Sequence, residues 1–239
     1  MKQYLKRIYG KSQDEYFKEL KKKLNKEEKQ FIITVNPESL MNAGKDKELD
    51  TMLLDEEVSL VPDGIAVVKA CQMLKIPVTQ RITGVDIAEY LLEEGNKQKK
   101  SVYLFGSKQE VLDAMDKVLE EKYPNIKVAG MTNGYVKDKD EVFKQIKKVQ
   151  PDICLVALGI PAQEKLIYKH LAEFNKGIFV GVGGSLDVLS GTKKRAPKLF
   201  IKLNLEWLYR IAKEPKRLGR FWDNNVKFIF EVRKEKKSK

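Results

Sequence analysis

The fold of this chain is decided by the stretch SVYLFGSKQEVLDAMDKVLEEK, residues 101–122. Its first five residues form an apolar run that predicts a buried strand. Gly106 and Ser107 then form a turn, and the rest of the stretch has the spacing of an amphipathic helix. Ser107 and Glu110 have the spacing of a capping box, which predicts that the helix begins there. The stretch therefore predicts one strand–turn–helix unit.

The same alternation of apolar runs and helical patterns continues on both sides of this unit. Further strands are predicted at residues 31–35, 58–61, 126–129, 153–158 and 177–182. Further helices are predicted at residues 37–43, 65–74, 86–94, 141–149 and 162–174. Connections of this kind are right-handed crossovers between parallel strands. We therefore expect the α/β class, with a Rossmann-like, mainly parallel sheet flanked by helices.

The two ends of the chain differ from this pattern. The first 30 residues are rich in Lys and Glu with weak helical periodicity, which predicts one loosely packed helix. Residues 195–239 contain 14 Lys and Arg against 5 Asp and Glu, whereas the preceding residues contain 32 against 29. The formal charge of +12 is thus concentrated at the C-terminal end. We expect an α/β core over residues 1–195 and a basic appendage over residues 196–239.

The appendage is expected to be helical and amphipathic. An apolar stripe in residues 199–212 predicts one helix, and Pro215 is expected to begin the next. Basic residues follow on one face, with Phe221 and Trp222 beside them. This combination is typical of a helix at an anionic membrane surface. A solvated basic face on a packed helix is one alternative. Nucleic acid is a weaker one, because no helix-turn-helix, zinc or RNP motif accompanies the charge.

Composition also indicates where the protein works. No stretch approaches the ~18 consecutive apolar residues of a membrane-spanning helix. The first residues lack the apolar core of a signal peptide, so we expect a cytoplasmic protein. Cys71 and Cys154 are both flanked by apolar residues, which predicts buried thiols in a reducing compartment.

Asp63 is the most informative single residue for function. It lies between Pro62 and Gly64, directly after the apolar run 58–61. An Asp at this place either caps the next helix, which is its commoner role, or acts as a base in a cleft. Other polar residues also lie at strand ends or turns: Thr34, Asn36, Arg81 and Gln163. Because ligands of parallel sheets bind at the carboxyl ends of the strands, this set favours a site for a phosphorylated sugar.

Three other motifs argue against particular kinds of chemistry. The glycine-rich run at residues 181–187 has Leu186 where a dinucleotide fingerprint needs its third glycine, so NAD binding is disfavoured. Asp138 and Asp140 precede a predicted helix, where capping is a better interpretation than metal binding, and we predict no metal. His170, the single histidine, lies within a predicted helix, which favours a packing role over hydrolase chemistry.

A set of short motifs occurs in order along the chain. They are TVNPE at 34–38, PDG at 62–64, RITGVD at 81–86, LGIPAQE at 158–164, GVGG at 181–184 with Asp187, KRAP at 194–197, and LEWLYR at 205–210 with Glu214 and Pro215. Together they resemble the WecG/TagA/CpsF glycosyltransferases across residues 30–222, and within them the TagA-type branch of wall teichoic acid synthesis. Each motif is weak alone, and the ordered set is specific.

The resemblance implies a reaction and a set of residues. The reaction is transfer of N-acetylmannosamine from its UDP donor to N-acetylglucosamine on undecaprenyl diphosphate, with inversion and with no metal or other cofactor. The resemblance implies that Asp63 is the base. It implies that Thr34, Asn36, Arg81 and Gln163 line the substrate pocket. To this predicted site we add the glycines at the strand ends, Gly106, Gly159, Gly183 and Gly184, and also Asp187. The resemblance also implies that Arg210, Arg217 and Arg220 of the appendage close over the donor diphosphate.

The implied partners are a UDP-sugar, a lipid-diphosphate acceptor and an anionic membrane surface, with a homodimer possible and no nucleic acid expected. The protein would work on the inner face of the cell membrane. Two alternatives remain open. One is a related transferase with a different UDP-sugar, such as N-acetylmannosamine uronate or a capsular hexose. The other is a non-catalytic module that binds a sugar nucleotide or nucleic acid.

Overall fold

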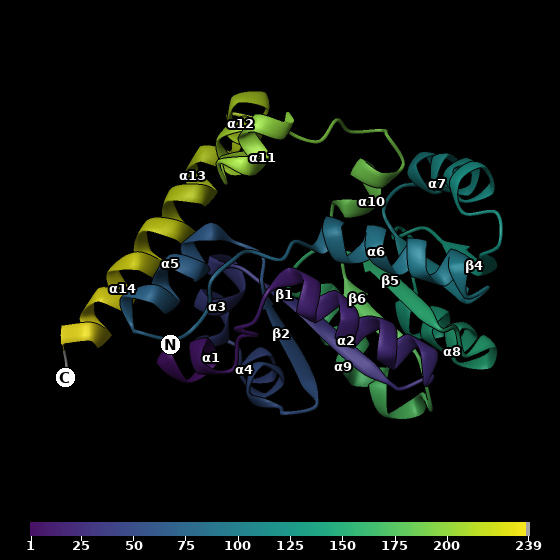
Figure 1. The fold of residues 1–239 in the computed structure, drawn as a ribbon, viewed down its shortest axis with the longest axis horizontal. Coiled ribbons are helices and arrows are strands. Elements are labelled where there is room, and N and C mark those ends of the chain that lie inside the picture. The colour runs from purple at the N-terminus through teal and green to yellow at the C-terminus, as the bar shows by residue number, and fades with distance from the viewer. Residues whose placement is uncertain (238–239) are drawn as a thin grey trace.

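The computed structural model describes residues 1–237, apart from the side chains of residues 217, 220 and 237. Its centre is a six-stranded sheet in which every pair of neighbours is parallel (Figure 1). The strands are β1 (Gln30–Val35), β2 (Val58–Pro62), β3 (Ser101–Gly106), β4 (Lys127–Thr132), β5 (Ile153–Ala157) and β6 (Ile178–Gly181). They lie in the order β2-β1-β6-β5-β3-β4. The predicted α/β class and parallel sheet are confirmed.

Helices cover both faces of the sheet, because successive strand residues point to opposite faces. Phe31 and Ile33 face one core, while Ile32 faces the other. The first core is covered by α1 (Lys2–Lys6), α3 (Pro37–Ala43), α4 (Lys47–Leu54), α5 (Ile65–Met73), α8 (Lys139–Val149) and α9 (Ala162–His170). The second is covered by α2 (Gln13–Asn25), α6 (Gly84–Lys97), α7 (Gln109–Lys122) and α10 (Ser185–Leu189). The fold is a three-layer sandwich.

The N-terminal residues form two packed helices, so the prediction of one loosely packed helix is wrong. Leu5 of α1 is fully buried in the first core, and Leu20 of α2 is buried in the second. Ser12 and Glu15 form a capping box that begins α2. Apolar residues spaced three or four apart among the lysines give each helix one face that fits the sheet.

Helix α7 (Gln109–Lys122) begins one residue later than the capping box predicts. Lys108 is its N-cap and provides no side-chain cap, so the capping box between Ser107 and Glu110 is not formed. Ser107 instead has φ +57°, and its hydroxyl donates to Asp187 Oδ2 at 3.3 Å. A partner 80 residues away in the sequence has therefore taken the hydroxyl that the local pattern assigned to the helix.

Two smaller interpretations of polar residues are confirmed. Asp138 caps α8 by accepting a hydrogen bond from the Glu141 N–H at 3.0 Å. His170 is buried, its ring stacks on Phe143, and its two nitrogens lie 2.6 and 2.7 Å from Glu173 and Asp140. Both thiols are buried as expected. In residues 1–237, three or more His, Cys, Asp and Glu side chains are nowhere grouped so that they could hold a metal ion.

The basic C-terminal segment is helical but more broken than predicted. It contains α11 (Lys198–Lys202), α12 (Glu206–Lys213), α13 (Arg217–Phe221), the π-helical turn η2 (Trp222–Val226) and α14 (Lys227–Lys237). One helix over residues 199–212 was predicted, but Asn204 has φ +58° and separates α11 from α12. Pro215 does not begin a helix either, because α13 begins at Arg217.

The last helix returns to the core. Phe228 and Val232 of α14 are fully buried in the first core, and α14 packs beside α5. Figure 1 shows α11 to α14 at one end of the molecule, with α7 and α8 at the opposite end. Within the described part of the chain, no helix has both the length and the apolar character needed to cross a membrane.

Candidate active site

A pocket of about 740 Å³ opens beside the carboxyl ends of β1, β2 and β6. It gathers most of the residues that the sequence singled out. Those that line it are Thr34, Asn36, Asp63, Arg81, Gln163, Gly183, Gly184 and Arg210. The side chains at the sheet edge meet as the carboxyl-end rule predicts. The appendage helix α12 adds Arg210 to them.

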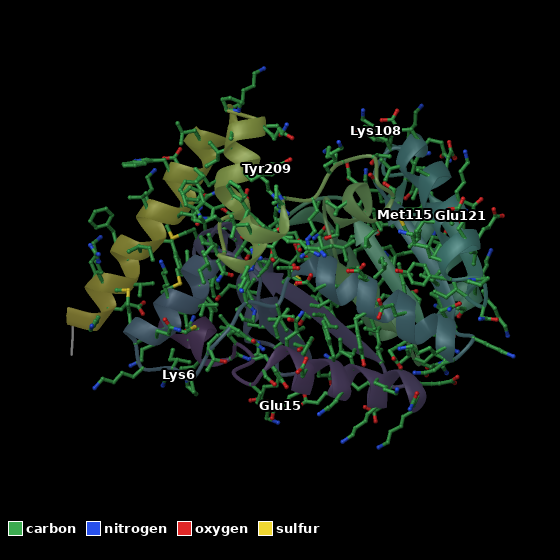
Figure 2. The ribbon with its side chains drawn as sticks, turned by 45° about the horizontal axis from the view of Figure 1, so that its top comes forward. Lys6, Glu15, Lys108, Met115, Glu121 and Tyr209 are labelled. Atoms are coloured by element: carbon green, nitrogen blue, oxygen red, sulfur yellow. The ribbon has the colours of Figure 1, made fainter. Side chains whose placement is uncertain are left out.

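A second pocket of about 370 Å³ adjoins the first. It contains two more predicted residues, Gly159 and Asp187, and its wall also includes Tyr135. Gly183 and Gly184 line both pockets, so the turn between β6 and α10 is their common wall. In Figure 2, Lys108, which lines this second pocket, lies well to the right of Tyr209 on α12.

Gly106 is the one predicted glycine that lines neither of these pockets. It is buried, with φ +120°, and a Cβ there would lie 2.3 Å from the Ala157 carbonyl oxygen. Only glycine tolerates both conditions. The structure therefore gives Gly106 a backbone role, in which the end of β3 passes close to the end of β5.

Asp63 stands between β2 and α5 and does not cap the helix. Its backbone N–H donates to the Val35 carbonyl at 3.0 Å, while Gly64 is the N-cap of α5 without any side-chain cap. The capping interpretation is therefore wrong. Among the described residues, the Asp63 carboxylate has no hydrogen-bond partner, and it lines the larger pocket. Its oxygens are available to a ligand.

The surroundings of Asp63 make it a stronger base than an ordinary aspartate. Burial raises the pKa of Asp63 to about 6, against the opposing effect of Arg210 and Arg81. Glu206 and Asp86 contribute smaller raising effects. At neutral pH the carboxylate is ionised and still accepts a proton readily, which suits a general base.

Glu206 connects the appendage to the core beside this carboxylate. It is only 4% exposed, and its Oε2 lies 2.5 Å from the Arg81 guanidinium. Its Oε1 lies 3.5 Å from Arg195, which in turn contacts Asp86 at 2.6 Å. Sequence reasoning recorded Glu206 only as part of a motif. The side chain that fixes the predicted pocket residue Arg81 was missed.

Gln163 is fixed by three hydrogen bonds. Its Oε1 accepts from the Gly159 N–H at 3.0 Å and from the Gly183 N–H at 3.1 Å. Its Nε2 donates to Glu164 Oε1 at 2.8 Å. Because two backbone donors face the oxygen, the amide has one orientation, and its second N–H remains for a ligand in the pocket. Gln163 thus links the turn at Gly159 to the turn at Gly183.

Glu164 holds the Gln163 amide by accepting its hydrogen bond. It is 1% exposed, and its Oε2 has no hydrogen-bond partner in the described structure. Burial raises the pKa of Glu164 to about 7, although the hydrogen bond from Gln163 lowers it. The only sequence signal for this role is the position of Glu164 directly after Gln163.

Thr34 and Asn36 lie at the end of β1 and have partly structural roles. The Thr34 hydroxyl donates to the Gly181 carbonyl at 3.4 Å, which links β1 to β6. Asn36 Oδ1 accepts from the Ser39 N–H at 3.0 Å and caps α3. Both still line the larger pocket, so each holds the local backbone while presenting the rest of its side chain to a ligand.

Of the three predicted arginines of the appendage, the structure describes the side chain of one. Arg210 of α12 is exposed and lines the larger pocket. The side chains of Arg217 and Arg220 lie outside the described part of the structure.

Comparison with known proteins agrees with this geometry. The model of the glycosyl transferase WecG/TagA/CpsF family matches residues 5–239. The chain belongs to this family. Two similar family enzymes come from Bacillus subtilis (strain 168) and Staphylococcus aureus (strain MW2), at 42% and 38% identity. Each match covers 87% of this chain, and 80% and 81% of the respective relative. Both relatives are N-acetylglucosaminyldiphosphoundecaprenol N-acetyl-β-D-mannosaminyltransferases. This chain is therefore a glycosyltransferase.

Proposed function

We propose that this enzyme transfers N-acetylmannosamine from UDP to N-acetylglucosamine on undecaprenyl diphosphate, in the synthesis of the wall teichoic acid linkage unit. The names of its relatives support this donor sugar and this acceptor. The observation that carries the chemistry is the Asp63 carboxylate, which has no hydrogen-bond partner among the described residues and faces the pocket.

In the proposed reaction Asp63 removes the proton from an acceptor hydroxyl. The hydroxyl oxygen then forms a bond to the anomeric carbon of the donor, and the bond from that carbon to the UDP oxygen breaks. Because attack and departure occur on opposite faces of the sugar, the configuration is inverted. A base of this kind contributes ~10²–10⁴-fold to the rate.

The two adjoining pockets suit a nucleotide sugar. We place the nucleotide in the smaller pocket, where Tyr135 offers an aromatic face and Asp187 a hydrogen-bond acceptor. The diphosphate then crosses the common wall at Gly183 and Gly184, where backbone approaches a ligand closely. The sugar lies in the larger pocket near Gln163 and Asp63.

Negative charge develops on the departing diphosphate and must be stabilised. Arg210 lines the larger pocket, and we assign this task to it. Its planar guanidinium binds two phosphate oxygens at once. We assign the same task to Arg217 and Arg220, and we assign no step to a metal or other cofactor.

The appendage, residues 196–239, is proposed to hold the enzyme on the inner face of the membrane, where its lipid substrate lies. Large apolar side chains are exposed along it: Leu199, Leu203, Leu208, Leu218, Trp222 and Phe230. They alternate with lysines and arginines, a combination that suits an anionic bilayer surface. A homodimer that buries the same side chains is the alternative, and sedimentation with anionic vesicles against size measurement without them separates the two.

The test of the function is UDP release from UDP-N-acetylmannosamine, with a short-chain lipid-diphosphate N-acetylglucosamine as acceptor. Wild-type enzyme should release UDP only when the acceptor is present. Asp63→Asn should lose this release while binding UDP with unchanged affinity in calorimetry. Release with another UDP-sugar alone would assign the chain to a related transferase. No release with any donor would refute the transferase and favour a binding module.

A further inference from the structure

The outer part of the larger pocket extends away from Asp63, between α5 and the C-terminal helices. Its walls are formed by Ile65, Ala66 and Lys69 of α5, Asn224, Asn225 and Val226 of η2, and Ile229, Phe230 and Arg233 of α14. This part of the pocket is mostly apolar, and no step of the donor chemistry uses it. Figure 1 shows α14 running alongside α5, so the two walls belong to neighbouring helices.

Two cations in these walls have no partner of their own. Lys69 and Arg233 are exposed at the pocket, and neither forms an ion pair or hydrogen bond with a described residue. The inner arginine Arg81 differs, because Glu206 neutralises it. Two exposed, unpaired positive charges beside Ile65, Ile229 and Phe230 fit a ligand that is both anionic and apolar.

The place of Lys69 on α5 relates that anion to Asp63. Asp63 lies just before α5, and Lys69 lies four residues after Ile65, the first residue of the helix. A helix rises ~1.5 Å per residue, so Lys69 stands ~6 Å further along the axis than Ile65. That separation is about one sugar ring. An acceptor sugar with its hydroxyl at Asp63 is thus long enough to carry its anomeric phosphate as far along α5 as Lys69.

We propose that this outer part of the pocket binds the polyprenyl diphosphate of the acceptor, with Lys69 and Arg233 on the diphosphate and Phe230 beside the first isoprene units. The inference rests on the proposed function and adds a second anionic subsite to it. We assign the donor diphosphate to other residues, namely Gly183, Gly184 and Arg210. Two diphosphates of like charge are thus held apart, with the reacting sugars between them.

The charge of the ligand matches the charges of the wall. A diphosphate diester carries two negative charges, and Lys69 and Arg233 supply two positive ones from two different helices. Phe230 is 56% exposed on α14, so its ring is available to an isoprene chain that continues from the phosphate. The site therefore requires α14 to stand beside α5, and it is incomplete without the appendage.

The kinetic test uses Lys69→Gln and Arg233→Gln, singly and together, with Lys117→Gln as control. Lys117 is an exposed lysine of α7, at the far end of the molecule, and it lines neither described pocket. Each single variant should raise the KM for the acceptor roughly 10-fold, as the loss of one charge-assisted contact does. The KM for the donor and kcat at saturating acceptor should stay within about twofold of wild type. The control should resemble wild type.

A binding test does not depend on turnover. Farnesyl diphosphate is titrated into UDP-saturated enzyme by calorimetry, with inorganic diphosphate in a parallel titration. Wild-type enzyme should bind farnesyl diphosphate more tightly than inorganic diphosphate, and the double variant should bind both weakly. Phe230→Ser should weaken only the binding of farnesyl diphosphate. Equal affinity of wild type for the two probes would refute the isoprene contact and reduce the site to a phosphate site.

The outcomes separate this inference from the proposed function. In one outcome the wild-type enzyme is active, and the double variant keeps its acceptor KM and its affinity for farnesyl diphosphate. This outcome would overturn the subsite while keeping the transferase. Inactive wild-type enzyme that binds farnesyl diphosphate through Lys69 and Arg233 would refute the transferase while keeping the subsite. Loss of UDP affinity in the double variant would also overturn the inference, because the two cations would then serve the donor.

Discussion

Glu206 and Arg81 are 125 residues apart in the sequence, yet their side chains form an ion pair at 2.5 Å. Glu206 belongs to the appendage helix α12, and Arg81 belongs to the segment before α6. The pair therefore holds the appendage over the pocket and gives Arg81 one position. It also places a negative charge near Asp63, which contributes to its raised pKa.

We expect Glu206→Gln to destabilise the protein by roughly 2 kcal/mol, because it leaves the partly buried Arg81 without its carboxylate partner. Urea unfolding measures this change. Glu231→Gln is the matched control, since its ion pair with Lys234 is exposed and should contribute less than about 1 kcal/mol. Equal effects of the two substitutions would show that the Glu206 pair does not hold the appendage.

The rate of transfer should depend on the ionisation of Asp63. Its pKa is raised to about 6, and the base works only when ionised. We expect kcat/KM for the acceptor to be level above pH 7 and to fall roughly tenfold per pH unit well below pH 6. A rate profile at constant ionic strength measures this. A profile that stays level down to pH 5 would contradict the role of Asp63 as base.

Asp63 should also make the folded protein less stable above pH 6. Its folded pKa of about 6 lies above its ordinary value of 3.8, so the folded state binds the proton more tightly than the unfolded state. The ionisation cost is absent below about pH 4, grows as the pH rises to 6, and is complete above. Asp63→Asn removes this cost.

We therefore expect Asp63→Asn to stabilise the protein by about 1–3 kcal/mol at pH 8, and by nothing measurable at pH 3.5. Chemical unfolding at both pH values measures the difference. A variant that is equally stabilised at the two values would show that the effect does not come from the charge. Lost activity with gained stability would identify Asp63 as a residue kept for chemistry.

Gln163 should couple the two pockets through its amide oxygen. Gln163→Ala removes the acceptor of the Gly159 and Gly183 N–H groups, and we expect roughly 2–4 kcal/mol of lost stability and weaker UDP binding. Calorimetry with UDP and thermal unfolding measure the two effects. Gln72→Ala, at an exposed position on α5, is the control. Unchanged UDP affinity in Gln163→Ala would separate the amide from the donor site.

Substitution by Ala should affect stability at Gly106 and UDP binding at Gly184. Gly106→Ala forces a Cβ to within 2.3 Å of the Ala157 oxygen at φ +120°, so we expect a loss of ~3 kcal/mol or more in stability. Gly184→Ala meets nothing within 4 Å and should leave stability unchanged. Because Gly184 lines both pockets, its variant should instead bind UDP more weakly. Unfolding and calorimetry on both variants check this.

Local patterns sufficed for most of the sheet and for the inner pocket. Four of the five strands that flank the 101–122 unit were predictable because buried parallel strands are continuous apolar runs, and β4 is a partly exposed edge strand. Thr34 and Asp63 could be placed together because parallel strands end at one edge of the sheet. Helix α4 was missed although its signal was present: Asp46 caps it, and Leu49, Met52 and Leu53 have helical spacing.

The rest depends on contacts that no local pattern contains. Ser107 leaves its predicted capping role because Asp187 lies beside it in the fold. Asn204 breaks the predicted appendage helix, and only the position of α12 over the pocket makes the Arg81–Glu206 pair possible. Such pairings are decided by tertiary packing, which overrides the weak preferences of short segments.

The common wall at Gly183 and Gly184 has a consequence for inhibitor design. Because the two pockets adjoin there, a fragment that binds in each could be joined by a short linker across the turn. Joining two weak fragments makes the second binding event intramolecular, which increases affinity by ~10²–10⁴-fold when the linker fits the span. Glycines present no side chain for such a linker to avoid. A substitution that blocked the linker would add a side chain at Gly183 or Gly184, where it would also obstruct the proposed path of the donor diphosphate.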